Sequence, residues 1–197
     1  MLSDVSKSEL HDMLVKAYID ARKNERNNKK HLLFEIDLET NIDKLTDKIW
    51  NKRWQPSPKV CFIIREPTVR EVFAPSISED ETVSHLLFNL LEPIFEPTFI
   101  YDSYSCRKGK GTLFGIERFD HHIRSVTNNY KHEGFVLNLD ISGYFMNIDR
   151  RILFDIVKRR CDLLKDYIKY DLIMYLVETI LASDPLEDVI RIGDPRL

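Results

Sequence analysis

The spacing of hydrophobic residues along the chain predicts six helices. Apolar residues recur every three or four positions in these segments, so each helix would present an apolar face to a core. Ser78 and Glu81 have the spacing of a capping box, and Pro93 is expected to end or kink the helix that they begin. The predicted helices cover residues 4–20, 38–49, 78–92, 112–126, 149–157 and 167–181. In the fourth of them, the residues expected to face inward are Ile116, Phe119, Ile123 and Val126.

Three other segments predict strands. Val60–Ile64 and Val69–Phe73 flank a short connection that contains a proline, a pattern typical of a hairpin. Phe135–Ile141 predicts a later strand, with one wholly apolar face and one that becomes polar toward Asp140. Helices, a hairpin and a later strand without regular βαβ alternation predict an α+β fold.

The composition is that of an ordinary globular protein. The 197 residues are 43% hydrophobic and 31% charged, which is enough to bury a core in one unit or in two small subdomains. No segment predicts a signal peptide, and no apolar run is long and charge-free enough to span a membrane. Cys61, Cys106 and Cys161 form no CxxC pair, so we expect reduced thiols in a cytoplasmic protein rather than disulfides or a zinc site.

The net charge of −3 argues against a uniformly basic nucleic-acid-binding protein, but charge is segregated along the chain. Residues 14–31 contain six Lys or Arg against two Asp or Glu, and residues 101–131 contain six against three. Residues 71–100 contain six Asp or Glu and neither Lys nor Arg. This alternation fits a protein that presents cations to phosphate on some faces only. Solvated helix faces of mixed sign are the alternative.

Asp140 is the first candidate for chemistry, because it lies where the predicted strand ends. A carboxylate presented there can hold Mg²⁺, which prefers oxygen ligands and takes only one or two from protein beside substrate phosphates. The backbone carbonyl of Ile141 could add a ligand. In the alternative interpretation Asp140 caps a turn. Asp149 precedes a helical face, and this position favours an N-cap over a metal ligand.

Arg65 and Arg70 belong to the hairpin and are candidates for phosphate contacts. Arginine in a hairpin can close over a triphosphate by paired hydrogen bonds. His121 and His122 are adjacent and cannot share one helix face, so we assign them to the surface or to nucleic-acid contact.

The segment Tyr101–Thr112 holds further candidates, Arg107, Lys108 and Lys110, among two glycines just before a helix. Cations and accessible backbone amides before a helix are typical of an anion site. The segment lacks the spacing of an ATP-binding P-loop, and a solvated loop is the alternative.

Four motifs in order resemble the fingers and first palm motifs of bacterial reverse transcriptases of the group II intron, retron and diversity-generating retroelement types. The similarity covers roughly residues 30–160, and the wording Tyr-x-Cys-Arg-Lys-Gly-Lys-Gly leans toward the last type. It implies an N-terminal helical segment at 1–55, fingers at 56–132 and the first part of a palm at 133–197. The motifs are Val69–Pro75, Leu90–Glu96, Ser103–Gly111 and the Asp140 segment.

The resemblance implies roles in nucleotidyl transfer for the residues around Asp140. Asp140 would be a catalytic ligand of Mg²⁺, helped by Ile141. Phe145 would be the bulky ring that leaves no room for the 2′-hydroxyl of a ribonucleotide. The alternative for Phe145 is a place in the core.

The resemblance also implies partners for the cations. Arg70, and with it Arg65, would contact the triphosphate of a dNTP. Arg107, Lys108 and Lys110 would lie along the path of the RNA template, the DNA primer or the nucleotide.

Two features depart from that family. Glu81 stands where the family often has a basic residue, and the Tyr-x-Asp-Asp turn that supplies the partner carboxylates does not appear. We therefore expect the fingers and half the palm of an RNA-directed DNA polymerase, inactive on their own. The alternatives are a non-catalytic RNA-binding module and a domain that self-associates through exposed apolar surface.

Overall fold

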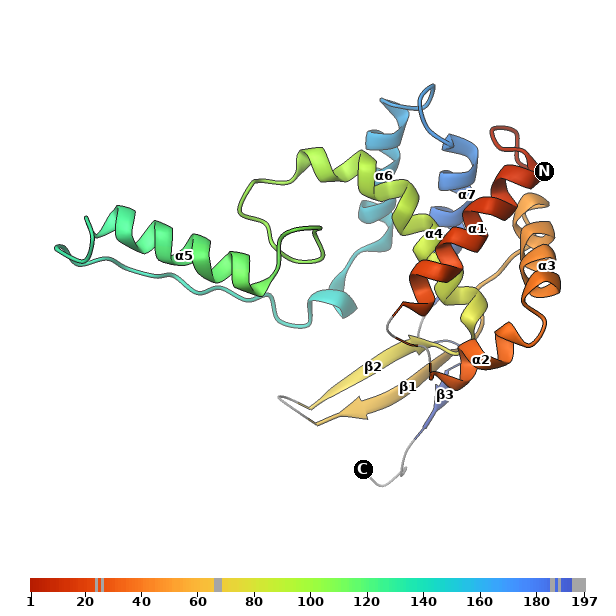
Figure 1. Ribbon diagram of the computed structural model, residues 1–197, viewed down its shortest axis with the longest axis horizontal. Helices are drawn as coiled ribbons and strands as arrows, with labels where there is room; N and C mark the ends of the chain where they lie inside the picture. Colours follow the sequence, from red (N-terminus) through yellow and green to blue (C-terminus); the bar gives the residue numbers. More distant parts are fainter. Residues whose placement is uncertain (24, 26, 66–68, 185–186, 188, 193–197) are drawn as a thin grey trace. The chain divides into compact units, whose positions relative to one another are not determined.

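The computed structural model describes residues 1–197 except for 24, 26, 66–68, 185–186, 188 and 193–197 (Figure 1). The chain forms two compact units, of which unit 1 contains Met1–Glu92 with Asp149–Leu197 and unit 2 contains Pro93–Ile148. The α+β class is confirmed, since the described residues form seven α-helices and a three-stranded sheet. The division at residues 55 and 132 concerns polymerase subdomains and stays a prediction.

Unit 1 contains most of the helices, and the periodic segments of the sequence locate all but α2. Pro93 does not end α4, which continues to Phe95, because the φ angle of proline is itself helical and only one hydrogen bond is lost. None of the described helices is long and apolar enough to cross a membrane. The helices are α1 (Lys7–Arg22), α2 (Lys29–Glu35), α3 (Leu38–Trp50), α4 (Ser78–Phe95), α6 (Arg150–Asp162) and α7 (Tyr170–Ala182).

The hydrophobic core of unit 1 is built by α1, α3, α4 and α7. Each helix contributes residues three or four positions apart, as the periodicity predicts. Full burial of one such side chain stabilises the fold by roughly 1.5–3 kcal/mol. The fully or almost fully buried members are Leu10, Leu14, Ile42, Leu45, Ile49, Val83, Leu86, Leu172 and Leu176.

The sheet of unit 1 has the strand order β2-β1-β3. β1 (Lys59–Ile64) and β2 (Arg70–Pro75) pair antiparallel, with Ile64 opposite Arg70, so the hairpin is confirmed. Residues 66–68 of its connection lie outside the described part of the chain. The short strand β3 (Ile190–Arg191) pairs parallel to β1 on its other side.

Polar side chains begin two helices of unit 1 in different ways. Asp149 Oδ1 accepts hydrogen bonds from the backbone amides of Arg151 and Ile152, at 2.8 and 3.1 Å, which confirms the predicted N-cap of α6. At the start of α4, the Ser78 hydroxyl instead lies 2.7 Å from a ring nitrogen of α2, and Glu81 forms an ion pair with α2.

Unit 2 consists of the end of α4, the short helix η1 (Glu96–Thr98), a loop, the helix α5 (Thr112–Val126) and an extended return segment at residues 133–141. Figure 1 shows this segment running alongside α5 before the turn η2 (Tyr144–Asn147). The predicted strand Phe135–Ile141 is wrong, because the segment is extended but joins no ladder among the described residues. A strand needs a partner, and the three described strands all belong to unit 1.

The apolar side chains of α5 and of the extended segment are largely exposed. The predicted inward face of α5 is wrong: Ile116 is 59% exposed and Val126 is 69% exposed. Phe135 in the extended segment is 96% exposed. One helix and one extended segment do not supply the second layer that a core needs. The segment approaches α5 closely at Gly134, where a Cβ would come within 2.9 Å of Thr127 Cγ2.

Candidate nucleotide and nucleic-acid site

Asp140 lies near the end of the extended segment of unit 2, and its side chain is exposed to solvent. Ile141 beside it is 68% exposed. The carboxylate is therefore accessible to a cation from solution, although the strand expected to present it is absent from the described residues. Asp140 owes its accessibility to an extended chain whose side chains lie on the surface.

The turn after Asp140 presents Phe145. Gly143 has a φ of 60°, a left-handed conformation that glycine adopts without steric cost. Asn147 Nδ2 donates a 2.9 Å hydrogen bond to the Gly143 carbonyl and closes the turn. Phe145 is 83% exposed, and its ring meets that of Tyr144 edge-on at 5.2 Å between centroids. Phe145 is therefore a surface ring rather than a core residue.

The described residues do not fit a complete magnesium centre at Asp140. Octahedral Mg²⁺ takes about six oxygen ligands. Asp140 and Ile141 would supply only carboxylate oxygens and one backbone carbonyl oxygen. Among the described side chains, Asp140 belongs to no group of three or more metal-binding residues. The two-metal site implied by the resemblance therefore needs carboxylates beyond those described here.

Arg107 organises the loop before α5. Its Nε and Nη2 donate hydrogen bonds of 2.7–3.0 Å to the Glu96 carboxylate, and its Nη1 donates to the carbonyls of Ile100 and Ser103 at 2.8 and 2.9 Å. The Arg107 side chain is only 9% exposed. These bonds also hold the pKa of Glu96 below its usual value. Contact of Arg107 with nucleic acid stays a prediction, but its observed bonds stabilise the loop.

Lys108 and Lys110 lie on a tight turn in the same loop. The Lys110 amide donates a 3.1 Å hydrogen bond to the Arg107 carbonyl, and Gly109 has the positive φ, 70°, that a type II turn requires. Lys110 Nζ lies 4.0 Å from the centre of the Tyr101 ring and donates to the Tyr101 carbonyl. Lys108 is exposed at the turn. A cation over an aromatic ring is a surface that nucleic acids can use for stacking and phosphate contact.

The sequence interpretation missed the network around Asp102. Arg118 Nε and Nη2 donate to the Asp102 carboxylate at 2.7 and 3.2 Å, and His122 Nε2 lies 2.9 Å from it. Arg118, and after it His122, hold the pKa of Asp102 well below its usual range. The sequence contained a sign of this network, because Arg118 and His122 are four residues apart on one predicted helix and therefore share a face.

The hairpin arginines belong to unit 1. Arg65 and Arg70 are both exposed. Ile64 pairs with Arg70 in the last described pair of the ladder, so Arg65 and Arg70 both lie toward the connecting end of the hairpin. Contact of these arginines with a triphosphate stays a prediction.

Unit 2 also has an apolar cavity of about 360 Å³ between α5 and the extended segment. The cavity is lined by residues from both elements, among them Phe119, Ile123, Val126, Phe135 and Leu137. Of the residues considered for nucleic-acid contact, His122 lines it, whereas Arg107, Lys108 and Lys110 do not.

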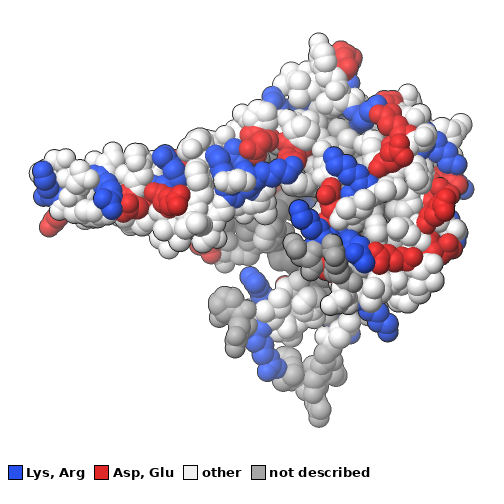
Figure 2. Space-filling model, viewed as in Figure 1, with Lys and Arg blue, Asp and Glu red and all other residues white. Residues whose placement is uncertain are grey.

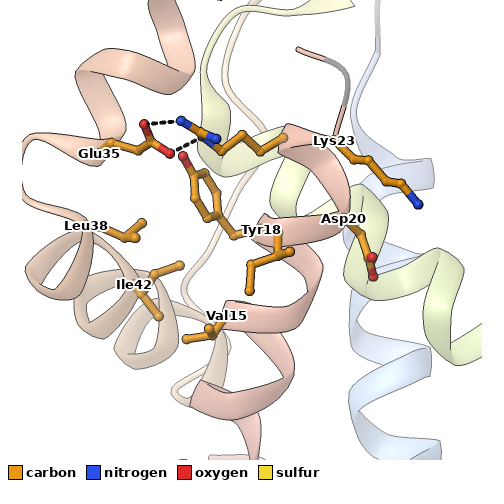
Figure 3. A pocket seen from close by; sticks show the side chains of 9 residues that line it. Val15, Tyr18, Asp20, Lys23, Glu35, Leu38 and Ile42 are labelled. Carbon is orange, nitrogen blue, oxygen red and sulfur yellow. Dashed lines mark hydrogen bonds and ion pairs between the residues drawn. The ribbon is translucent and has the colours of Figure 1, made fainter. Parts of the chain in front are cut away.

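A second cavity, of about 560 Å³, lies in unit 1 between α1 and α3 (Figure 3). Apolar side chains such as Val15 and Ile42 line it, and an ion pair between Arg22 and Glu35 lies at its edge. Burial, and after it the Glu35 carboxylate, raises the pKa of Tyr18. The two cations of its lining, Arg22 and Lys23, are balanced by Asp20 and Glu35, so the cavity has no excess of positive charge and does not resemble a phosphate site.

Charges of both signs lie side by side on the displayed face of unit 2 (Figure 2). The acidic stretch at residues 71–100 supplies partners for cations from other stretches. Much of the segregated charge is therefore used in pairs within the protein rather than presented to phosphate. These pairs include Glu79 with Lys48, Glu81 with Lys30, and Glu96 with Arg107.

Comparison of the chain with known protein families and with curated proteins found no match. Membership of the reverse transcriptase family stays a prediction, which rests on the resemblance of the four sequence motifs.

Proposed function

We propose that the chain is the nucleotide- and nucleic-acid-contacting part of an RNA-directed DNA polymerase. The observation that carries the proposal is the exposed Asp140, followed by the left-handed turn at Gly143 and the exposed Phe145. An accessible carboxylate followed by an accessible ring is the order of groups in the enzymes that the motifs resemble. The exposed arginines of the hairpin support a triphosphate contact.

In this proposal the chain binds a primer–template and a dNTP but does not join them. Two-metal nucleotidyl transfer needs several charged oxygens around the ions, whereas Asp140 belongs to no group of three or more metal-binding side chains among the described residues. We expect no primer extension on an RNA template by this chain with Mg²⁺ and dNTPs. Extension that Asp140→Ala abolishes would contradict the claim of inactivity.

Nucleotide binding tests the polymerase assignment directly. We expect the chain to bind dNTPs, and Arg70→Ala to weaken that binding through loss of a bidentate phosphate contact. Arg53→Ala is the matched control, because Arg53 is also exposed in unit 1 but lies outside the hairpin. Phe145→Ala should reduce the preference for dNTP over rNTP. A chain that binds no dNTP, or that loses equal affinity with either arginine variant, would refute the assignment.

The second candidate function is a non-catalytic RNA-binding module, which the cation–ring contacts of the loop before α5 favour. Binding should then fall with salt between about 50 and 200 mM and should survive Asp140→Ala. Lys108→Ala should reduce the salt slope by about one, whereas the exposed Lys44 on α3 provides a control. RNA binding without dNTP binding would favour this second function.

A further inference from the structure

Three side chains of unit 1 lie close together, and none of them was predicted to contact nucleotide or nucleic acid. His31 of α2, Glu81 of α4 and Glu25 of the connection before α2 each offer one ligand atom, and these atoms lie within 4.8 Å of one another. Glu81 Oε2 lies 3.1 Å from His31 Nε2, and Glu25 Oε2 lies 3.8 Å from it.

The imidazole of His31 is fully buried, yet its Nε2 has no hydrogen-bond partner. Glu81 Oε2, also buried, likewise has none, although the two atoms are only 3.1 Å apart. The oxygen is therefore near the nitrogen but outside the direction in which an N–H would donate. Two ligands of one metal ion have this relationship, because each points at the ion rather than at the other.

The two separations that involve His31 agree with shared coordination, and all three ligand atoms lie within 4.8 Å of one another. Zinc-to-ligand distances of about 2.0–2.2 Å in a tetrahedral site place neighbouring ligand atoms about 3.4 Å apart. The two distances from His31 Nε2, 3.1 and 3.8 Å, lie on either side of that value.

Each of the three side chains is held by a second residue. The Ser78 hydroxyl lies 2.7 Å from His31 Nδ1, so it can fix the ring orientation. Asn28 Nδ2 donates a 2.8 Å hydrogen bond to Glu25 Oε2. Lys30 forms an ion pair with Glu81 Oε1 and leaves Oε2 facing the histidine. Metal ligands are oriented by outer partners of this kind.

We propose that Glu25, His31 and Glu81 bind a divalent first-row transition metal ion of the zinc type. One imidazole nitrogen and two carboxylate oxygens suit such an ion, with a fourth position open to water, whereas Mg²⁺ prefers oxygen alone. The two carboxylates and Lys30 leave a net charge of −1 to attract the cation. The bound ion links α2 and the connection before it to α4. This site is independent of the polymerase proposal.

Titration of the purified chain with Co²⁺, followed by visible absorption, and then displacement by Zn²⁺ tests the site. We expect one ion per chain, no competition by Mg²⁺, and a thermal transition that Zn²⁺ shifts upward. Glu25→Gln and Glu81→Gln should each weaken binding at least about tenfold, and Ser78→Ala by roughly 10- to 100-fold. Glu25 is exposed, so its variant tests the site even where the buried variants disturb folding.

Glu79→Gln is the matched control, because Glu79 lies on the same helix and pairs with Lys48 at 2.8 Å. It should bind the ion as the unaltered chain does. Failure of the chain to bind Co²⁺ or Zn²⁺, or equal binding by the Glu25, Glu81 and Glu79 variants, would overturn the proposal. The titration contains no nucleic acid or nucleotide, so its failure would leave the polymerase proposal intact.

Discussion

Unit 1 and unit 2 are stabilised by different interactions. Unit 1 buries a continuous set of leucine, isoleucine and valine side chains from four helices. Unit 2 exposes most of its apolar side chains, and its described contacts are dominated by charged pairs such as Arg107 with Glu96 and Arg118 with Asp102. Hydrophobic residues alone therefore do not make a core; a second layer must cover them. Four perturbations test how far this difference extends.

The largest effect should come from emptying part of the core of unit 1. Leu176 is fully buried, and Leu176→Ala should lower the free energy of unfolding by about 2–5 kcal/mol through lost burial and a residual cavity. Leu113 on α5 is 70% exposed, so Leu113→Ala should change it by less than about 0.5 kcal/mol. Urea unfolding measures both. Equal losses would show that unit 2 has a core of its own.

Acid should affect unit 2 before the core of unit 1. Paired cations lower the pKa of Glu96 and Asp102, and Tyr130 followed by Arg124 lowers that of Asp120. A lowered folded-state pKa means that these groups stabilise the fold above their ordinary pKa of about 4 and lose that contribution as pH falls through the folded value.

In unit 1, paired cations likewise lower the pKa of Glu35 and Asp162, whereas burial raises that of Asp80, so that protonation of Asp80 favours the folded state. Unit 1 differs in having a buried apolar core, which acid does not titrate. NMR spectra recorded from neutral pH down to pH about 2 should show the amides of Gly109 and Gly111 changing before those of Leu45 and Leu176. Simultaneous changes in both units would contradict the expected difference in their sensitivity to acid.

A smaller effect should come from the turn of the loop before α5. Gly109 has a φ of 70°, so Gly109→Ala should cost about 1–2 kcal/mol of local stability although nothing lies near the added Cβ. Gly111 has a φ of −154°, which alanine also adopts, and its surroundings are equally open. Gly111→Ala is therefore the control. Amide exchange of the loop should accelerate in the first variant only.

The smallest of the four effects should come from the N-cap of α6. Asp149→Ala removes the acceptor for two backbone amides and should cost about 1 kcal/mol in urea unfolding. Asp155→Ala removes an exposed carboxylate from the middle of the same helix and should cost less. A larger loss of stability in the Asp155 variant would show that the charge on the helix, rather than its N-cap, determines the stability of α6.

The parts of the fold that depend on local pattern could be predicted from the sequence. Helical spacing located the core helices, and the hairpin and the Asp149 cap followed from short segments. The prediction of a strand at Phe135–Ile141 was wrong. Alternation of apolar and polar residues shows that a segment can be extended, but it does not show that a partner strand lies beside it. The inward face predicted for α5 failed for the same reason.

The roles predicted for the residues of the candidate site stay predictions, and the contacts that these residues make could not be predicted from the sequence. Asp140 and Phe145 are exposed, as a nucleotide site needs, while Arg107 is largely buried in bonds to Glu96 and to two carbonyls. The cluster of Glu25, His31 and Glu81 spans more than fifty positions of chain, so only the tertiary fold brings it together.

The three free cysteines differ in their accessibility, and this gives the protein a built-in attachment point for a probe. Cys61 and Cys161 are buried, and burial also raises the pKa of the Cys161 thiol, whereas Cys106 is exposed beside Arg107. A maleimide dye should therefore label the folded protein at Cys106 first. The fluorescence of the dye would then report changes in the surroundings of this loop without any engineered residue.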